Sequence, residues 1–167
     1  MNDEHGRVRV VYDCVVFLQG LIKESGPAAD CLDLFEDGII ELFISEGLLN
    51  EIGDVLTRPD LQHKFPLLTQ ERADELLEGL KERATFLESV PTQFSYDRDP
   101  KDEMYVNLAV AAGAAYLVSR DNDLLDLMKE TDTGRDFQER FPSLTILDPV
   151  AFLREVEESV KEFSGDE

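Results

Sequence analysis

The stretch DPKDEMYVNLAVAAGAAYLVSRDNDLLDL, residues 99–127, decides the fold of this chain. Asp99 and Pro100 predict a helix start, because aspartate caps a first turn and proline fits the first helical position. Small apolar residues continue to Gly113, which predicts a closely packed helix. The apolar run Ala115–Ser119 predicts a strand, and Asp123 can cap a short helix at the paired leucines. This order is typical of one repeating unit of a parallel α/β sheet.

Outward from this stretch, strands alternate with helices along the chain. Short β-rich runs predict further strands at 7–13, 39–44, 85–90 and 144–147. Helical patterns fill most intervals and start at Gly26-Pro27, Ser45, Thr69 and Pro149. The polar segment 129–142 is expected to be a mobile loop, and residues 164–167 a disordered tail. We therefore expect an α/β fold, in a single domain spanning residues 1–167, with a core at about 7–153 and right-handed crossovers.

Several function classes find no support in the residues. The cysteines, Cys14 and Cys31, are far apart and have no metal-ligand spacing, so neither a disulfide framework nor a zinc site is indicated. His5 and His63 belong to no histidine motif. No apolar run approaches the length of a membrane span. The first residues, MNDEHGRVRVVYD, lack the apolar stretch of a signal peptide, so we expect a cytoplasmic protein.

The formal charge of −21, from 37 acidic and 16 basic residues, is unfavourable for binding nucleic acid. A basic surface normally supplies such affinity through counterion release from phosphates. Three explanations would reconcile this charge with an RNA substrate. Divalent cations would reverse the field locally, a basic partner or second subunit would complete the groove, or the acidity is an adaptation to high salt.

Four carboxylates are expected to meet at one edge of the sheet. Asp13 directly follows the first strand, and Asp121 lies two residues after Ser119, at the end of another. In open α/β sheets, ligands bind beyond these carboxyl ends. Glu51 lies at the margin of an apolar helical stripe, and Asp102 lies in the first turn of its helix. Alone, Asp13 and Asp121 are explained equally well as turn residues, and Glu51 and Asp102 are better explained as a half-exposed acid and a cap. Together they favour Mg²⁺ or Mn²⁺, hard ions that take oxygen ligands and assist phosphodiester cleavage.

Three motifs resemble the PIN domain family, and within it the VapC-like group of toxin–antitoxin ribonucleases. The first is VRVVYDCVVFLQGL with Asp13, and the second is SEGLLNEIGDVLTRPDL with Glu51. The third is the stretch 99–127, in which Asp102 opens the alanine-rich helix and Ser119 and Asp121 form the hydroxyl-x-acid pattern. The resemblance covers roughly residues 7–153.

The resemblance implies a PIN-like three-layer α/β/α fold, with a central, mainly parallel sheet of four to five strands. It also implies cleavage of single-stranded RNA by a Mg²⁺- or Mn²⁺-dependent ribonuclease. Family members are often homodimers, and a toxin would have an antitoxin protein as its partner. The residues that the resemblance assigns as metal ligands are Asp13, Glu51, Asp102 and Asp121, with Asp123 as a secondary ligand and Ser119 as support for a carboxylate or water.

One departure from the family pattern leaves an alternative open. The family commonly has a small hydroxylated residue and then asparagine after its first aspartate, where this chain has Cys14 and Val15. Losing that amide weakens support for the site, which favours a catalytically weak or inactive binding or scaffold domain as the second hypothesis. A metal-dependent phosphatase of another α/β fold is a third, weaker option, because the DCVV segment lacks a second aspartate.

Basic residues near the acids offer candidate contacts to phosphate. These are Arg58, Arg98, Lys101 and Arg120. Surface ion pairs explain each of them at least as well. Arg120 is the best candidate for contact with RNA, because it adjoins Asp121.

Overall fold

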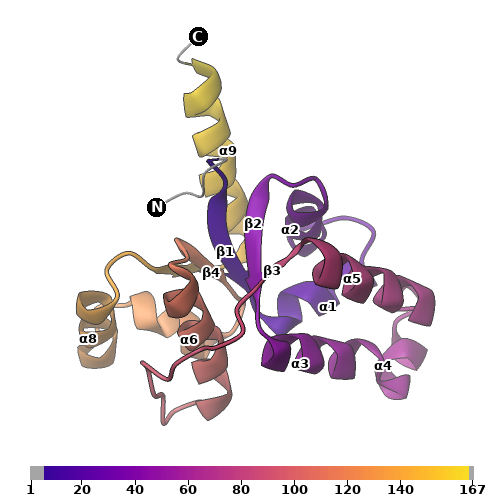
Figure 1. Cartoon of the computed structure of the whole chain (residues 1–167), viewed down its shortest axis with the longest axis horizontal. Helices are drawn as coiled ribbons and strands as arrows, with labels where there is room; N and C mark the ends of the chain where they lie inside the picture. Colours follow the sequence, from indigo (N-terminus) through magenta and orange to yellow (C-terminus); the bar gives the residue numbers. More distant parts are fainter. Residues whose placement is uncertain (1–5, 166–167) are drawn as a thin grey trace.

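A computed structural model describes residues 6–165, with side chains described for residues 6–159. Five parallel strands form one sheet in the order β3-β2-β1-β4-β5 (Figure 1). Their bounds are β1 Val8–Tyr12, β2 Ile40–Ile44, β3 Thr85–Phe86, β4 Tyr116–Val118 and β5 Thr145–Leu147. The predicted α/β class and parallel sheet are confirmed. No helix in the described part of the chain is long and apolar enough to cross a membrane.

Helices cover both faces of the sheet. The side chain of Tyr12 identifies one face, because its ring contacts Phe17 and Phe152 and its hydroxyl donates to the carbonyl of Cys31. These partners lie on α1 (Cys14–Ile22), α9 (Pro149–Gly165) and α2 (Pro27–Glu36). Side chains alternate along a strand, so Val11 points to the other face. There α6 (Glu103–Ala112) packs on β1, β2 and β4 (Figure 1).

The remaining helices form the longer crossovers. α3 (Glu46–Leu56), α4 (Pro59–Lys64) and α5 (Gln70–Arg83) lie between β2 and β3. α7 (Asn122–Leu125), a 3₁₀ turn η2 (Asp126–Met128) and α8 (Asp132–Arg140) lie between β4 and β5. Two predicted caps are confirmed, since Ser45 Oγ accepts from Leu48 N and Thr69 Oγ1 accepts from Arg72 N. Local sequence therefore fixes where these helices begin.

The strand order reverses direction beside β1. From β1 the chain builds outward through β2 to β3, and then returns past β1 to form β4 and β5. Helices consequently leave β1 and β4 on opposite faces, which is the arrangement that binds ligands in open α/β sheets. The hydrogen-bond ladder between β1 and β4 continues past Tyr12, because Asp13 N donates to Val118 O at 3.1 Å.

Segment 129–142 is a correction to the sequence prediction. We expected a mobile loop, whereas residues 132–140 form α8. Thr131 Oγ1 caps the helix by accepting from Gly134 N, and a Cβ on Gly134 would lie 2.1 Å from the carbonyl oxygen of Lys129, so only glycine fits there. The rings of Phe137 and Phe141 both pack against Phe94. Two aromatic residues one turn apart thus anchor a helix that is otherwise polar and largely exposed.

Three element boundaries also differ from the prediction. The third strand is two residues long, since the chain leaves β2 after Phe86 and continues as an irregular segment to Asp99. Ser164 and Gly165 of the expected tail are the last residues of α9. Residues 166–167 of that tail lie outside the described residues. The predicted helix start at Asp99 is a 3₁₀ turn, η1 (Pro100–Asp102), which leads into α6.

Replacing Phe137 with alanine tests whether α8 is a packed helix. The ring is 1% exposed and its centroid lies 5.2 Å from that of Phe94. We expect Phe137→Ala to lower the free energy of unfolding by about 3–5 kcal/mol, because it leaves a cavity in a packed aromatic group. Urea unfolding measures the change. Glu139→Ala, on the exposed side of the same helix, is the control; equal, small effects of both substitutions would restore the mobile-loop prediction.

Candidate metal centre

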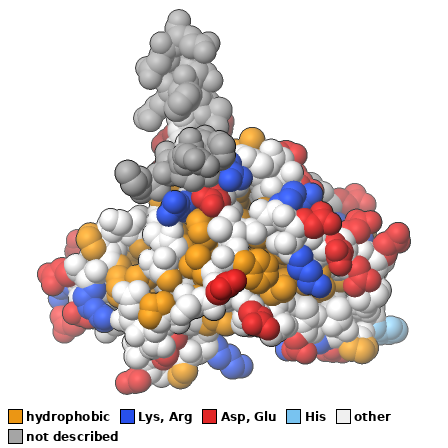
Figure 2. All heavy atoms as spheres, in the orientation of Figure 1, with side chains coloured by type: hydrophobic (Ala, Val, Ile, Leu, Met, Phe, Trp, Pro, Cys, Tyr) orange, Lys and Arg blue, Asp and Glu red, His pale blue; other side chains and the backbone are white. Residues whose placement is uncertain are grey.

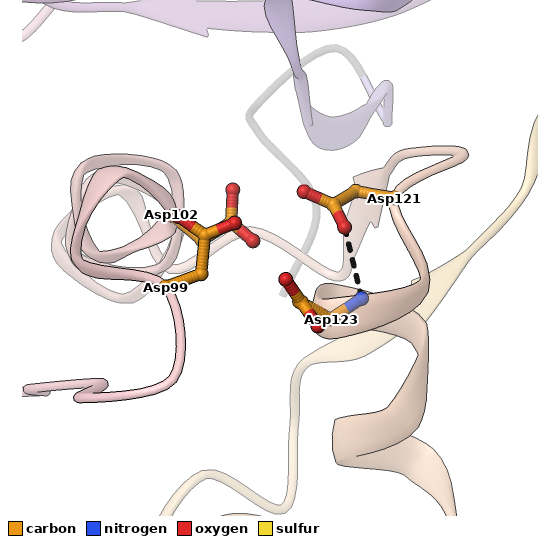
Figure 3. A group of neighbouring side chains, drawn as sticks. All are labelled: Asp99, Asp102, Asp121 and Asp123. Atoms are coloured by element: carbon orange, nitrogen blue, oxygen red, sulfur yellow. Dashed lines mark hydrogen bonds between the residues drawn. The ribbon is translucent and has the colours of Figure 1, made fainter.

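Four aspartates converge at the carboxyl edge of the sheet. One carboxylate oxygen from each of Asp99, Asp102, Asp121 and Asp123 lies within 4.8 Å of the others. Figure 3 shows Asp99 and Asp102 pointing across a gap toward Asp121 and Asp123. We call these four residues the aspartate cluster. Asp99 and Asp102 come from the segment that precedes α6, and Asp121 and Asp123 come from the segment that follows β4.

Helix starts hold these aspartates in place. Asp99 Oδ1 accepts from Lys101 N at 3.2 Å and caps η1. Asp121 Oδ1 accepts from Asp123 N at 2.9 Å and caps α7 (Figure 3). Capping uses one oxygen of each carboxylate and satisfies a backbone donor that the helix leaves free. The local turn chemistry of the chain therefore also fixes the directions of Asp99 and Asp121.

Asp102 is the most confined member of the aspartate cluster. It is 4% exposed, and its Oδ2 atom is buried with no hydrogen-bond partner among the described residues. Burial, together with repulsion and a shared proton from the nearby carboxylates of Asp121 and Asp99, raises the pKa of Asp102 to about 8. A buried acceptor without a donor is rare and costly in proteins. Asp102 thus lacks a donor or cationic partner for this oxygen among the described residues.

Asp13 is connected to the aspartate cluster through Ser119. The Ser119 hydroxyl donates to Asp13 Oδ2 and accepts from Asp121 N at 2.9 Å. Asp13 Oδ1 also accepts from Val16 N at 3.0 Å, which caps α1. Burial raises the pKa of Asp13 to about 6, although its hydrogen bonds with Ser119 and Val16 oppose that rise. Ser119, 0% exposed, therefore links the Asp13 carboxylate to the backbone of Asp121.

Glu51 lies near Asp13 but outside the aspartate cluster. Its Oε1 atom accepts from the hydroxyl of Tyr105 at 2.8 Å. The same hydroxyl accepts from Cys14 N at 3.3 Å, one residue after Asp13. Burial, followed by the neighbouring Glu51, raises the pKa of the Tyr105 phenol well above its ordinary range, so the phenol stays protonated and can donate.

The basic residues near the site divide into paired and unpaired side chains. Arg58 pairs with Asp54, and Arg98 pairs with both Asp123 and Asp126. These two therefore have the surface-pair role that the sequence also allowed. Arg120 is exposed and has no ion pair within the described range of residues. It remains a candidate for contact with phosphate.

The structure brings most of the sequence-based candidates together and adds one. Asp102, Asp121 and Asp123 share the aspartate cluster, Asp13 joins it through Ser119, and Glu51 lies beside Asp13 through Tyr105. Asp99 was interpreted from sequence only as a helix cap. Its spacing of three residues from Asp102 was the available signal, because residues so spaced share one side of a helical turn.

The donor set of this site fits a hard divalent cation. All four ligand atoms are carboxylate oxygens, and the described residues place no histidine or thiol among them. Mg²⁺ and Mn²⁺ favour such ligands, whereas zinc favours nitrogen and sulfur. The unpartnered Oδ2 of Asp102 independently indicates a missing positive partner.

Comparison with known proteins identifies the architecture. A family model described as the PIN domain matches residues 9–123, which is more than half of the chain. The chain belongs to the PIN domain family. An uncharacterized protein of Methanocaldococcus jannaschii, MJ1680, is 30% identical over 125 residues, which cover 74% of this chain and 77% of the relative. PIN domains are generally metal-dependent nucleases that use divalent ions, and the acidic group at this edge agrees with that class.

Melting the metal-free PIN domain at different pH values tests the crowding of its carboxylates. Asp13 and Asp102 have folded-state pKa values raised from 3.8 to about 6 and about 8. The folded state therefore keeps protons that the unfolded chain releases, and this stabilisation, complete below about pH 4, is lost as the pH rises toward about 8. In EDTA, we expect the melting temperature to fall by more than about 5 °C across this window.

The variant Asp102→Asn identifies the source of that pH dependence. It cannot ionise, so its melting temperature should fall less between about pH 4 and 8 than that of the unmodified protein. Asp136→Asn, on an exposed acid of α8, controls for the change in net charge. Parallel pH profiles for the unmodified protein and Asp102→Asn would contradict the inferred crowding.

Proposed function

We propose that this PIN domain is a metal-dependent endoribonuclease that cleaves phosphodiester bonds of single-stranded RNA with Mg²⁺ or Mn²⁺. The observation that carries the proposal is the aspartate cluster, with its buried and unpartnered Asp102 oxygen. Carboxylates that repel one another at a strand edge are stabilised by a hard cation. The family supplies the nuclease class, and the third sequence motif supplies the likeness to ribonucleases.

The acidic residues and Ser119 would have different roles in holding the metal ion and positioning its ligands. Asp102, Asp121 and Asp123, with Asp99, would hold the ion, while Asp13 and Glu51 provide further negative charge at the same edge. When bound, a divalent cation supplies Lewis acidity toward phosphate oxygens and activation of water. Ser119 fixes Asp13 relative to the backbone of Asp121, and therefore keeps the two strand ends in register.

The acidic character of the protein opposes the approach of an RNA substrate. On the face in Figure 2, acidic side chains gather over α5, hydrophobic side chains are exposed across the middle, and basic side chains are scattered. With a net charge of −21, long-range attraction to RNA must come from bound cations, a basic partner or a second subunit. A homodimer and an antitoxin partner, as in VapC-like toxins, are proposals that rest on the sequence resemblance.

A binding or scaffold domain without turnover is the second candidate. Val15 stands where the family pattern commonly has asparagine, and its side chain is apolar and 44% exposed beside Asp13. An apolar residue there offers no hydrogen bond to the acids or to water. This observation favours weak activity, and the same cleavage assay distinguishes the two candidates.

Cleavage of labelled single-stranded RNA in Mn²⁺ tests the proposed activity. Asp13→Asn and Asp102→Asn should each lower kcat by more than about 100-fold, because removing even an outer partner of a metal site costs about 10- to 100-fold. Asparagine retains capping ability at Asp13, so the fold should persist. The matched control Asp136→Asn should cleave like the unmodified protein.

Each outcome of this assay has a defined meaning. Equal cleavage by all variants would indicate a contaminating nuclease and would refute the activity. Absence of both cleavage and Mn²⁺ binding in the unmodified protein would favour the scaffold candidate. Loss of cleavage in the two site variants, with the control unaffected, supports the nuclease, and parallel reactions in Mg²⁺ identify the better ion.

Binding measurements on Arg120→Ala test its contact with RNA. In the Asp102→Asn background, which prevents cleavage, removing one phosphate contact should weaken binding and reduce the salt slope of log K by about 0.7 for a single strand. Arg58→Ala is the control, because that side chain already pairs with Asp54. Equal slopes for Arg120→Ala and the control would remove Arg120 from the RNA-binding surface.

A further inference from the structure

We propose that Tyr105 is a positioning residue that holds the Glu51 carboxylate at the edge of the sheet beside Asp13. The inference rests on the proposed nuclease function and extends it, because it assigns a role to a residue that carries no acid. Tyr105 lies on α6, Glu51 on α3 and Cys14 at the start of α1. One phenol therefore joins three separate helices at the site.

The two hydrogen bonds of Tyr105 fix the direction of its hydroxyl proton. Cys14 N can only donate, so the hydroxyl must accept from it at 3.3 Å. The single proton of the phenol is then available to Glu51 Oε1, at 2.8 Å. Glu51 Oε1 accepts this bond, which leaves Oε2 outside the pair. A phenylalanine could fill the same space but could make neither bond.

Burial makes this arrangement rigid. Tyr105 is 6% exposed and Cys14 is 5% exposed, whereas Glu51 is half-buried. Among the described residues, the phenol of Tyr105 is the side chain that donates to Glu51. A half-buried glutamate without this donor would be free to rotate toward solvent.

The place of Tyr105 along α6 connects Glu51 with the aspartate cluster. Tyr105 lies three residues after Asp102, so both side chains leave the same side of the helical turn. The backbone that donates to the phenol, Cys14 N, directly follows Asp13. The phenol thus ties Glu51 to the two segments that carry Asp13 and Asp102, and a shift of α3 relative to α6 would break the bond.

Calorimetric titration with Mn²⁺ and RNA cleavage together test this inference. We expect Tyr105→Phe to weaken Mn²⁺ binding by about 10-fold and to lower cleavage to a similar extent at limiting Mn²⁺, the scale for losing a partner that orients a ligand. The matched control is Tyr12→Phe, which also removes a buried phenol hydrogen bond, to the carbonyl of Cys31 on the other face of the sheet. It should leave Mn²⁺ affinity unchanged.

A double substitution separates positioning from a general structural effect. If Tyr105 acts through Glu51, adding Tyr105→Phe to Glu51→Gln should cause little further loss of Mn²⁺ affinity, because coupled residues are not additive. Two outcomes would overturn the inference without affecting the proposed nuclease function. One is that the losses of Mn²⁺ affinity caused by the two single substitutions multiply in the double variant, and the other is that Tyr105→Phe and Tyr12→Phe have the same Mn²⁺ affinity. An unmodified protein that neither binds Mn²⁺ nor cleaves RNA would overturn this inference together with the proposed function.

Discussion

Repulsion between carboxylates that the fold forces together is the constraint on which this site depends. Asp99, Asp102, Asp121 and Asp123 present oxygens within 4.8 Å of one another, and Asp102 is buried with one oxygen unpartnered. Burial and the like charges around it raise the pKa of Asp102, and their repulsion destabilises the metal-free protein at neutral pH. Proteins tolerate such local cost chiefly at functional sites, where a bound group relieves it. A hard cation is the group that this oxygen set fits.

Ordinary helix caps give the acids their rigidity. Asp13, Asp99 and Asp121 each accept from a backbone N–H at the start of a helix, so repulsion cannot swing them apart without breaking a cap. Ser119 adds a connection between two adjacent strand ends. The same residues therefore stabilise the fold locally and fix the geometry of the site. Because these acids have both roles, each one taken singly in the sequence is readily interpreted as a helix cap alone.

Contacts of two buried tyrosines align helices that are distant in the sequence. Tyr105 links α6 to α3 and to the start of α1, while packing of Tyr12 against Phe17 and Phe152 secures the opposite face of the sheet. Apolar contacts thus secure the face of the sheet that Tyr12 occupies, while acidic residues gather at the carboxyl edge. With a net charge of −21 spread over the chain, a cation at that edge would provide a concentrated positive charge for a phosphate to meet.

The sequence by itself determined the alternation of strands and helices, the caps at Ser45 and Thr69, and acids at the ends of two strands. These features depend on residues within a few positions of one another, which is why periodicity and turn chemistry reveal them. Tertiary structure alone decided that α8 is a helix, since burial of Phe137 against Phe94 outweighs its polar composition. It also decided the membership of Asp99 in the cluster and the bond from Tyr105 to Glu51, 54 positions away. Such contacts depend on how the strands are ordered in space, and no local pattern records that order.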